Sequence, residues 1–335
     1  MPKLATEINN NSLADDDGAK VKDQTPVPYF KSFKTPILWS KVFNIWLLHT
    51  LFLGLGPALV LTKISTLVFG YILTLAAVLG VQVGAHRYYC HRAFKANFAF
   101  RLLIVICQTI SLQKDIYDWC RDHRVHHKFS ETDADPHNSN RGFFFSHMGW
   151  LMLSKHPEVR RKGATIDLSD VIADPLVRLQ RKYYYFVWVP IFWFAIPVAV
   201  PMYFWGESFY ASFMICVIAR YTITLHITFL VNSWAHAYGN RPYSEKLIPV
   251  EASCRHMLMG EGFHNYHHVF PNDYSASEFG PMDVFNPATA IINFFAAIGW
   301  AWDLKKADPK LIRKIAAESG DKQAQYQLGT RRWIV

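Results

Sequence analysis

Four long apolar runs constrain the fold of this chain more than any other feature. Each has about 20 residues or more and almost no charge, enough for a helix to cross a hydrocarbon layer near 30 Å thick. Charged residues make up only 18% of the chain, against about 25% in typical soluble domains. Buried core helices are the alternative, but two close pairs of such runs fit membrane hairpins better. The sequence predicts an all-α integral membrane protein with four transmembrane helices, at Val42–Thr62, Thr66–Ala85, Tyr183–Phe204 and Phe209–Val231.

The distribution of basic residues sets the expected orientation. The short turn within the first pair holds one basic residue, Lys63, and the turn within the second pair holds none. By contrast, residues 86–182 hold 16 Lys and Arg, and residues 233–335 hold 11. Because cytoplasmic loops accumulate Lys and Arg, both termini and the middle segment are expected to face the cytosol. The net charge of +9 suits anionic membrane lipids, a phosphate-bearing substrate or an acidic partner, and no nucleic-acid-binding motif is present.

Three regions are expected along the chain. Residues 1–35 are predicted to be a disordered N-terminal tail, because they are polar and lack the apolar stretch of a cleavable signal peptide. Residues 36–303 hold the four spans and a cytosolic helical cap. Residues 304–335 form a basic cytosolic tail with an amphipathic stretch from Pro309 to Glu318. The five cysteines are odd in number and widely spaced, which suits a reducing compartment.

Nine of the fifteen histidines gather in four clusters just outside the apolar runs. Spacings of three and four residues place side chains on one helix face, so the histidines of a cluster can converge. Neutral imidazole is a ligand for iron, zinc and copper. One isolated histidine is usually a satisfied core residue, but nine in clusters predict a metal site. The nine are His86, His91, His123, His126, His127, His236, His264, His267 and His268.

Nine imidazoles suit two metals better than one. The zinc signature H-E-x-x-H is absent, and a structural zinc ion needs only four ligands. The Glu-x-x-His pattern of ferritin-like di-iron proteins does not fit either, since the only acids beside the clusters are Asp122, Glu131 and Glu261. A dinuclear site built from imidazole at a membrane surface favours iron and dioxygen chemistry on a lipid.

Three histidine motifs carry a resemblance to a known family. They resemble the histidine boxes of the membrane acyl-CoA desaturases, and the resemblance runs from about Pro36 to Asp303. The stretches Asp118–Ser130 and Gly142–Trp150 look like the stearoyl-CoA type, and most like its insect members. The boxes are His86-x4-His91, His123-x-x-His126-His127 and the run from Gly260 to His268.

The resemblance implies an enzyme of the endoplasmic reticulum membrane. Its substrates would be a fatty acyl-CoA and dioxygen, with electrons relayed by cytochrome b5, and its product an acyl chain with a new double bond. It also implies two iron ions (Fe2+) on the cytosolic side. By motif, His86, His91, His123, His127 and His267 would hold one iron, and His126, His236, His264 and His268 the other, with Asn232 reaching it through water.

The resemblance also assigns contacts to the CoA moiety. Arg121, Asp122 and Lys155 match positions that contact CoA in relatives. A solvated surface charge is the alternative for Arg121. The chain departs from the usual vertebrate pattern at Lys114 and Ser154, where relatives often carry Asn and Arg.

A second set of residues is expected along the acyl chain. Gln113, Trp119 and Thr228 match positions that shape a bend in the chain, with ordinary packing near the membrane as the alternative. On the second span, Thr74, Val78 and Gln82 share the helix face of His86 and are candidates for lining the acyl tunnel. Thr74 is expected near the blind end of that tunnel.

Other functions stay open at this point. The same boxes occur in membrane lipid hydroxylases, so hydroxylation is an alternative reaction. A histidine-rich metal transporter is a non-enzymatic alternative, but it needs ligands inside the spans, where His49 and His226 are the only histidines. For a desaturase, a double bond at carbon 9 is the default, with carbon 11 open. The histidines outside the boxes are expected to be hydrogen-bonding or structural: His49, His137, His147, His156, His226 and His256.

Overall fold

The computed structural model describes residues 35–281 and 284–322. The expected N-terminal tail therefore lies outside the described residues, apart from Thr35. The described part is mainly helical and carries two small antiparallel sheets. They pair β1 (Lys95–Ala96) with β4 (Ala301–Trp302), and β2 (Gly239–Asn240) with β3 (Glu251–Ala252).

Three helical segments in the described part are long and apolar enough to cross a membrane, and they contain the second, third and fourth predicted runs. Ile64–Cys90 consists of α3 (Ile64–Leu79) and the π-helix η3 (Gly80–Cys90). Pro175–Trp205 consists of α9 (Pro175–Tyr183), the π-helix η6 (Tyr184–Ala195) and α10 (Ile196–Trp205). Phe209–His236 consists of α11 (Phe209–Phe213), the π-helix η7 (Met214–Ala219), α12 (Arg220–Ser233) and the 3-10 turn η8 (Trp234–His236).

The first predicted run is not one continuous helix. It divides into α1 (Trp39–Leu53) and α2 (Gly56–Leu61), which are separated by Gly54 and Leu55. Pro57 lies in the first turn of α2. The proline ring has no N–H to donate and disfavours helical geometry at the preceding residue, so a helix ends before it. The structure therefore corrects the expectation of an unbroken helix over Val42–Thr62.

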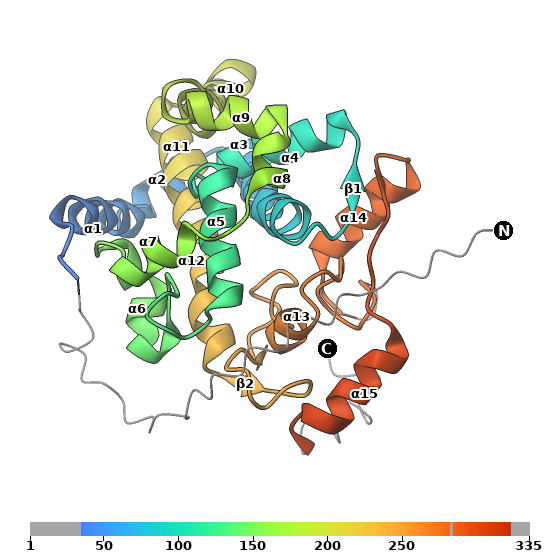
Figure 1. The fold of residues 1–335 in the computed structure, drawn as a ribbon. Helices are drawn as coiled ribbons and strands as arrows, with labels where there is room; N and C mark the ends of the chain where they lie inside the picture. The colour runs from blue at the N-terminus through green and yellow to red at the C-terminus, as the bar shows by residue number, and fades with distance from the viewer. Residues whose placement is uncertain (1–34, 282–283, 323–335) are drawn as a thin grey trace.

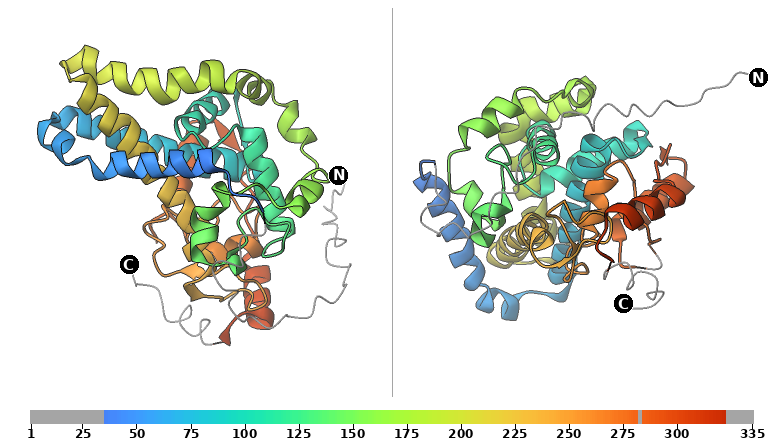
Figure 2. Two further views of the ribbon diagram at one scale, coloured as in Figure 1. Left: turned by 90° about the vertical axis from the view of Figure 1, so that its left-hand side faces the viewer. Right: turned by 60° about the horizontal axis from the view of Figure 1, so that its bottom comes forward.

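Residues 91–174, 237–281 and 284–322 are called the cap. In Figure 2 (left), α1–α3, α10 and α11 extend together at one end of the molecule, and the cap helices α13 and α15 lie at the other. In Figure 1, α13 lies near the centre of the molecule, below the end of α5. The helices of the cap are α4 (Phe98–Ile110), α5 (Ile116–Lys128), η4 (Ser139–Arg141), α6 (Phe143–His147), η5 (Gly149–Leu151), α7 (Pro157–Gly163), α8 (Ser169–Ala173), α13 (His264–Val269), α14 (Pro287–Ala297) and α15 (Pro309–Ser319).

Local capping explains where the two helices beside the site begin. The side chain of Asn97 accepts a hydrogen bond from Phe100 N at the start of α4, and that of Asp115 accepts one from Asp118 N at the start of α5. The amphipathic α15 lies within the predicted C-terminal tail, where buried Ile312 joins a cluster with Tyr243, Phe263 and Tyr266. This helix therefore packs on the cap.

The π-helix η3 lies in direct contact with α4. A methyl group added at Gly80 would lie 2.2 Å from the carbonyl carbon of Cys107, and one at Gly84 would lie 2.1 Å from Cγ2 of Ile104. Glycine allows the two backbones to approach this closely. This contact holds η3, which carries His86, against α4 of the cap.

Candidate metal centre

Ring nitrogens of the nine clustered histidines come together in two adjacent groups. In each group, every ring contributes one nitrogen, and these nitrogens all lie within 4.8 Å of one another. Most of the rings are buried. The first histidine group consists of His86, His91, His123, His127 and His267, and the second histidine group of His126, His236, His264 and His268.

Helix geometry explains how box residues meet. On α5, His123, His126 and His127 follow α-helical spacing and reach both groups from one side. His86 and His91 are five residues apart, which on an α-helix would separate them by about 140°. The π-helix η3 removes that separation, because the N–H of His91 bonds to the carbonyl of His86 at 3.1 Å and brings the two ring centroids to 4.8 Å.

The spacing of the ring nitrogens fits ligands around a metal. A metal–imidazole bond of about 2.1 Å places neighbouring ligands about 3.0 Å apart at 90°, and about 3.4 Å apart in a tetrahedron. The observed Nε2–Nε2 distances are 2.9 Å for His86–His267 and His91–His123, 3.1 Å for His127–His267, 3.0 Å for His236–His264 and 3.1 Å for His264–His268. The donor set and its spacing therefore fit imidazole ligands around a metal ion.

Three buried carboxylates orient the histidine rings. Nδ1 of His86 lies 3.2 Å from Glu261, Nδ1 of His126 lies 2.9 Å from Asp135, and Nδ1 of His236 lies 2.7 Å from Glu131. A carboxylate that accepts the Nδ1–H leaves the Nε2 lone pair free for a metal. The sequence had indicated Glu131 and Glu261 as acids beside the clusters. It missed Asp135.

Glu261 remains ionised inside the protein. Burial raises the pKa of its carboxyl, but the charges and hydrogen bonds of Arg87 and His86 lower it overall to about 2. Arg87 donates to Oε1 of Glu261 from Nε at 3.0 Å and from Nη2 at 2.8 Å. It also donates from Nη1 to Thr289 Oγ1 at 2.9 Å and to the carbonyl of Tyr274 at 3.1 Å. Arg87 thus joins η3 to the segment before α13 and to α14.

The three residues expected at CoA assemble with Lys114 into one ionic cluster. Asp122 is buried and lies 2.6 Å from Lys114 Nζ, in contact with Lys155 Nζ, and 3.4 Å from Arg121 Nη2. Burial raises the pKa of Asp122, but Lys114 and Lys155 lower it overall to about 2. Arg121 also pairs with Asp118 at 3.0 Å, so three cations and two carboxylates leave one positive charge for an anionic group. Lys114, a departure from the vertebrate pattern, is one of the three.

The residues expected along the acyl chain lie on α3, α5 and α12 and in the loop before α5. Gln113 Nε2 donates to Thr228 Oγ1 at 2.9 Å, which joins the α4–α5 loop to α12. The Trp119 ring stacks on His123, with centroids 4.9 Å apart and planes at 26°. Thr74 Oγ1 bonds to the carbonyl of Gly70 within α3 at 2.8 Å. Asn232 lies half-buried one turn before His236.

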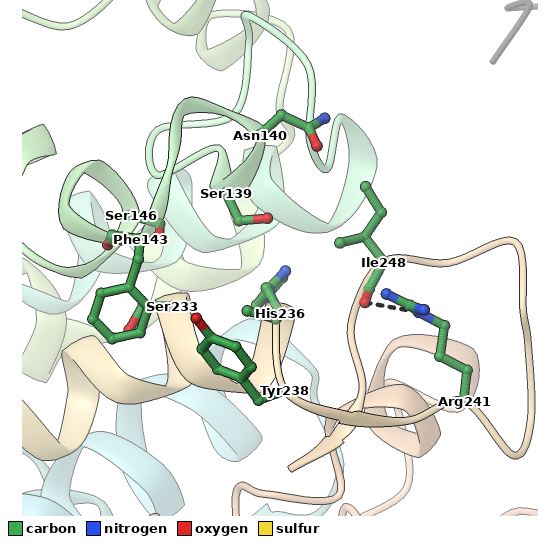
Figure 3. A pocket seen from close by; sticks show the side chains of 10 residues that line it. Ser139, Asn140, Phe143, Ser146, Ser233, His236, Tyr238, Arg241 and Ile248 are labelled. Carbon is green, nitrogen blue, oxygen red and sulfur yellow. Dashed lines mark hydrogen bonds between the residues drawn. The ribbon is translucent and has the colours of Figure 1, made fainter. Parts of the chain in front are cut away.

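A cavity of about 260 Å³ opens beside the second histidine group. Figure 3 shows His236 within it, between Ser139 and Asn140 on one side and Tyr238 and Arg241 on the other. Oxygen and nitrogen atoms line much of this cavity, so it suits water or a polar ligand.

Two of the unassigned histidines have local roles. His137 lies next to the second histidine group, with its Nδ1 3.5 Å from Asp135 and its ring 4.4 Å from the ring of His126. His156 caps α7 by accepting a hydrogen bond from Glu158 N at 3.3 Å. Three more, His49, His147 and His226, contact one another away from both groups.

Comparison with known proteins identifies the family. A family model described as fatty acid desaturase matches residues 64–275. Stearoyl-CoA desaturase 5 of Homo sapiens is 48% identical over 292 residues, which cover 86% of this chain and 87% of the relative. Acyl-CoA Delta-12 desaturase of Tribolium castaneum is 46% identical over 287 residues, covering 85% and 80%. Acyl-CoA Delta-9 desaturase of Acheta domesticus is 46% identical over 291 residues, covering 86% and 81%. The resemblance inferred from the histidine boxes is confirmed, and the chain belongs to the fatty acid desaturase family.

Proposed function

We propose that this protein is an acyl-CoA desaturase with two iron ions, one held by each histidine group and Asn232 reaching the second through water. The observation that carries the proposal is the convergence of nine imidazoles in two groups, in which five pairs of ring nitrogens lie 2.9–3.1 Å apart. When bound, the irons would supply the activation of dioxygen that cleavage of an unactivated C–H bond requires.

The overall reaction removes one hydrogen from each of two adjacent methylenes. Dioxygen takes up those two hydrogens, two protons and two electrons, and leaves as two water molecules. Reduction of dioxygen to two waters takes four electrons and the two C–H bonds supply two, so an external donor must supply the other two. Cytochrome b5 fits that role, and it would approach from the cytosolic face of an endoplasmic reticulum membrane protein.

The residues of this chain would bind and orient the acyl-CoA. Lys155, Arg121 and Lys114, gathered by Asp122, lie at the rim where CoA phosphates would be held. The Gln113–Thr228 hydrogen bond and the ring of Trp119 would bend the acyl chain next to the first histidine group. Thr74, Val78 and Gln82 would line the chain on the α3–η3 side.

The membrane topology belongs to the same proposal. The three long apolar helices cross the membrane, and α1 with α2 forms the fourth crossing with a break at Gly54. Both termini then lie on the cytosolic side together with the cap. Glycosylation-site tags in the turn at Lys63 should be modified, whereas tags at either terminus should not. Modification at a terminus would contradict this topology.

The position of the double bond depends on tunnel depth. Relatives named for Delta-9 and Delta-12 desaturation are both 46% identical to this chain, so overall identity does not decide the position. Carbon 9 is the proposed default. A small residue such as Thr74 near the blind end would let a chain pass deeper than a bulky aromatic would, which keeps carbon 11 open.

Expression in yeast that lacks its own desaturase tests the function. The expected result is growth without added unsaturated fatty acid, with new double bonds located by mass spectrometry. A His264→Ala variant, expressed and inserted to the same level, should give none. Hydroxy acids without new double bonds would overturn desaturation in favour of hydroxylation. Metal flux into vesicles without lipid oxidation would favour a transporter.

A further inference from the structure

Three histidines outside the metal groups form a continuous hydrogen-bonded chain. His49 lies on α1, His226 on α12 and His147 on α6. Nε2 of His49 lies 3.0 Å from Nε2 of His226, and Nδ1 of His226 lies 2.9 Å from Nε2 of His147. The chain ends at the carbonyl of Ile45, 2.7 Å from His49 Nδ1, and at the hydroxyl of Ser233, 2.9 Å from His147 Nδ1. His226 uses both nitrogens for different neighbours, so the three rings cannot share one metal ion.

The rings of the histidine chain bond to a carbonyl, to a hydroxyl and to one another, and no carboxylate is among these partners. Burial, with a smaller effect from His226, lowers the pKa of His147 to about 4. Among the described residues, the ionisable groups that affect its pKa are His226 and His49, and neither is an acid that could stabilise a positive ring. Polar groups in such surroundings are costly unless hydrogen-bonded. The contacts of the histidine chain therefore have to be satisfied by the protons of neutral imidazoles.

Counting those protons fixes the direction of every bond. Three neutral rings carry three N–H groups, but the chain has four contacts to fill. The carbonyl of Ile45 can only accept, so His49 donates to it, His226 donates to His49, and His147 donates to His226. The fourth hydrogen must come from Ser233, whose hydroxyl donates to Nδ1 of His147. The hydroxyl also lies 2.8 Å from the carbonyl of Phe229, and the neutral chain draws it away from that carbonyl.

Ser233 occupies the point where the last span changes geometry. α12 ends at Ser233, and the tighter 3-10 turn η8 begins at the next residue. His236 is the last residue of that turn and belongs to the second histidine group, and Asn232 directly precedes Ser233. Ser and Thr hydroxyls bonded to the carbonyl four residues back bend helices, so the partner chosen by Ser233 affects the turn that follows.

We propose that His147, His226 and His49 are positioning residues that act through Ser233 to fix the turn carrying His236, and so complete the second histidine group. The histidine chain joins α12 to α6 of the cap and to α1, both of which contact α12. This inference rests on the proposed function, since it takes the second histidine group to be an iron site. It adds to that function three residues that touch neither iron nor substrate.

The test compares His226→Phe, which keeps a ring but removes both links, with His226→Gln, which restores a donor and an acceptor. The protein is purified with 57Fe, and Mössbauer spectra resolve the two iron environments. His91→Ala and His268→Ala assign the signals to the first and second groups. In His226→Phe, the signal of the second group should change and its iron should be held about 10- to 100-fold more weakly. The signal of the first histidine group should stay unchanged in His226→Phe. The His226→Gln variant should recover much of the wild-type signal of the second histidine group.

His256→Phe is the matched control, because His256 is exposed and lies outside both groups and the histidine chain. It should leave both signals unchanged. If His226→Phe cannot be purified in folded form, Ser233→Ala takes its place in the test. It removes the hydrogen bond between Ser233 and His147 with little change in volume, and should alter the signal of the second histidine group alone. Unchanged spectra, or equal loss of both irons, would overturn the inference while leaving the proposed function intact. Wild-type protein without iron would instead overturn the proposed function.

Discussion

Replacement of Glu261 by Gln should test how strongly the carboxylates behind the histidines hold the structure together. Glu261 is 4% exposed and accepts two hydrogen bonds from Arg87, which is 1% exposed. Burial alone would raise its pKa, yet Arg87 and His86 bring it from 4.5 to about 2. A shift of that size corresponds to about 3 kcal/mol. Removing one partner of a buried ion pair costs about 3–5 kcal/mol, because the other charge stays buried and uncompensated.

Thermal unfolding in detergent, followed together with iron content, measures this effect. Glu261→Gln should lower Tm by roughly 5–10 °C and weaken iron retention about 10- to 100-fold, because the single amide oxygen cannot accept from both Arg87 and His86 Nδ1. The double variant Arg87→Gln/Glu261→Gln should be less destabilised than the sum of the single variants, since no charge is then left unpaired. Glu158→Gln removes the exposed pair with Arg161 and serves as control, with no measurable change expected. A wild-type Tm in Glu261→Gln, or additive effects in the double variant, would refute this reasoning.

Four further outcomes are expected. Gly80→Ala should lower Tm and reduce activity even with iron supplied, because its methyl group would overlap the backbone at Cys107; a wild-type Tm would show that α4 yields freely. Asp122→Asn should raise KM for acyl-CoA several-fold more than it lowers kcat. The folded-state pKa of Asp122 lies below its ordinary value of 3.8, so its ion pairs stabilise the protein above about pH 4 and are lost as the pH falls towards 2. The Tm difference between Asp122→Asn and wild type should therefore vanish near pH 2. Asp135→Asn should weaken iron retention through His126, as measured by metal analysis after dialysis, whereas an unchanged iron content would remove Asp135 from the support of the site. Chelation of iron should lower the Tm of wild-type protein more than that of His91→Ala, and equal shifts would contradict binding at the first group.

Local spacing was enough to indicate which histidines gather. His123, His126 and His127 lie on one helix, and His264, His267 and His268 on another, so their convergence follows from helical periodicity. The structure brings the same nine histidines into the same two groups that the resemblance implied. The sequence Gly54-Leu-Gly-Pro57 also indicates the break in the first predicted span. The prediction of one unbroken helix relied instead on the apolar composition of the run.

Features that depend on distant contacts could not be predicted in this way. The pairing of His86 with His91 requires a π-helix, and η3 is stabilised by its packing on α4 rather than by its own residue propensities. Asp135 supports His126 only because the chain after α5 folds back on it, and a turn-forming sequence carries no sign of that contact.

The histidine chain shows the same limit most clearly. His49 and His226 are 177 residues apart, and His147 and His226 are 79 apart, so no spacing rule connects them. Each alone looks like an isolated histidine in or near an apolar run, for which a satisfied structural role is the reasonable expectation. That expectation is compatible with the structure, but the partner that satisfies each ring is another ring. Clustering in the sequence therefore identifies the histidines that can bind a metal. Only the structure connects His49, His147 and His226 to one another and, through Ser233, to the turn that carries His236.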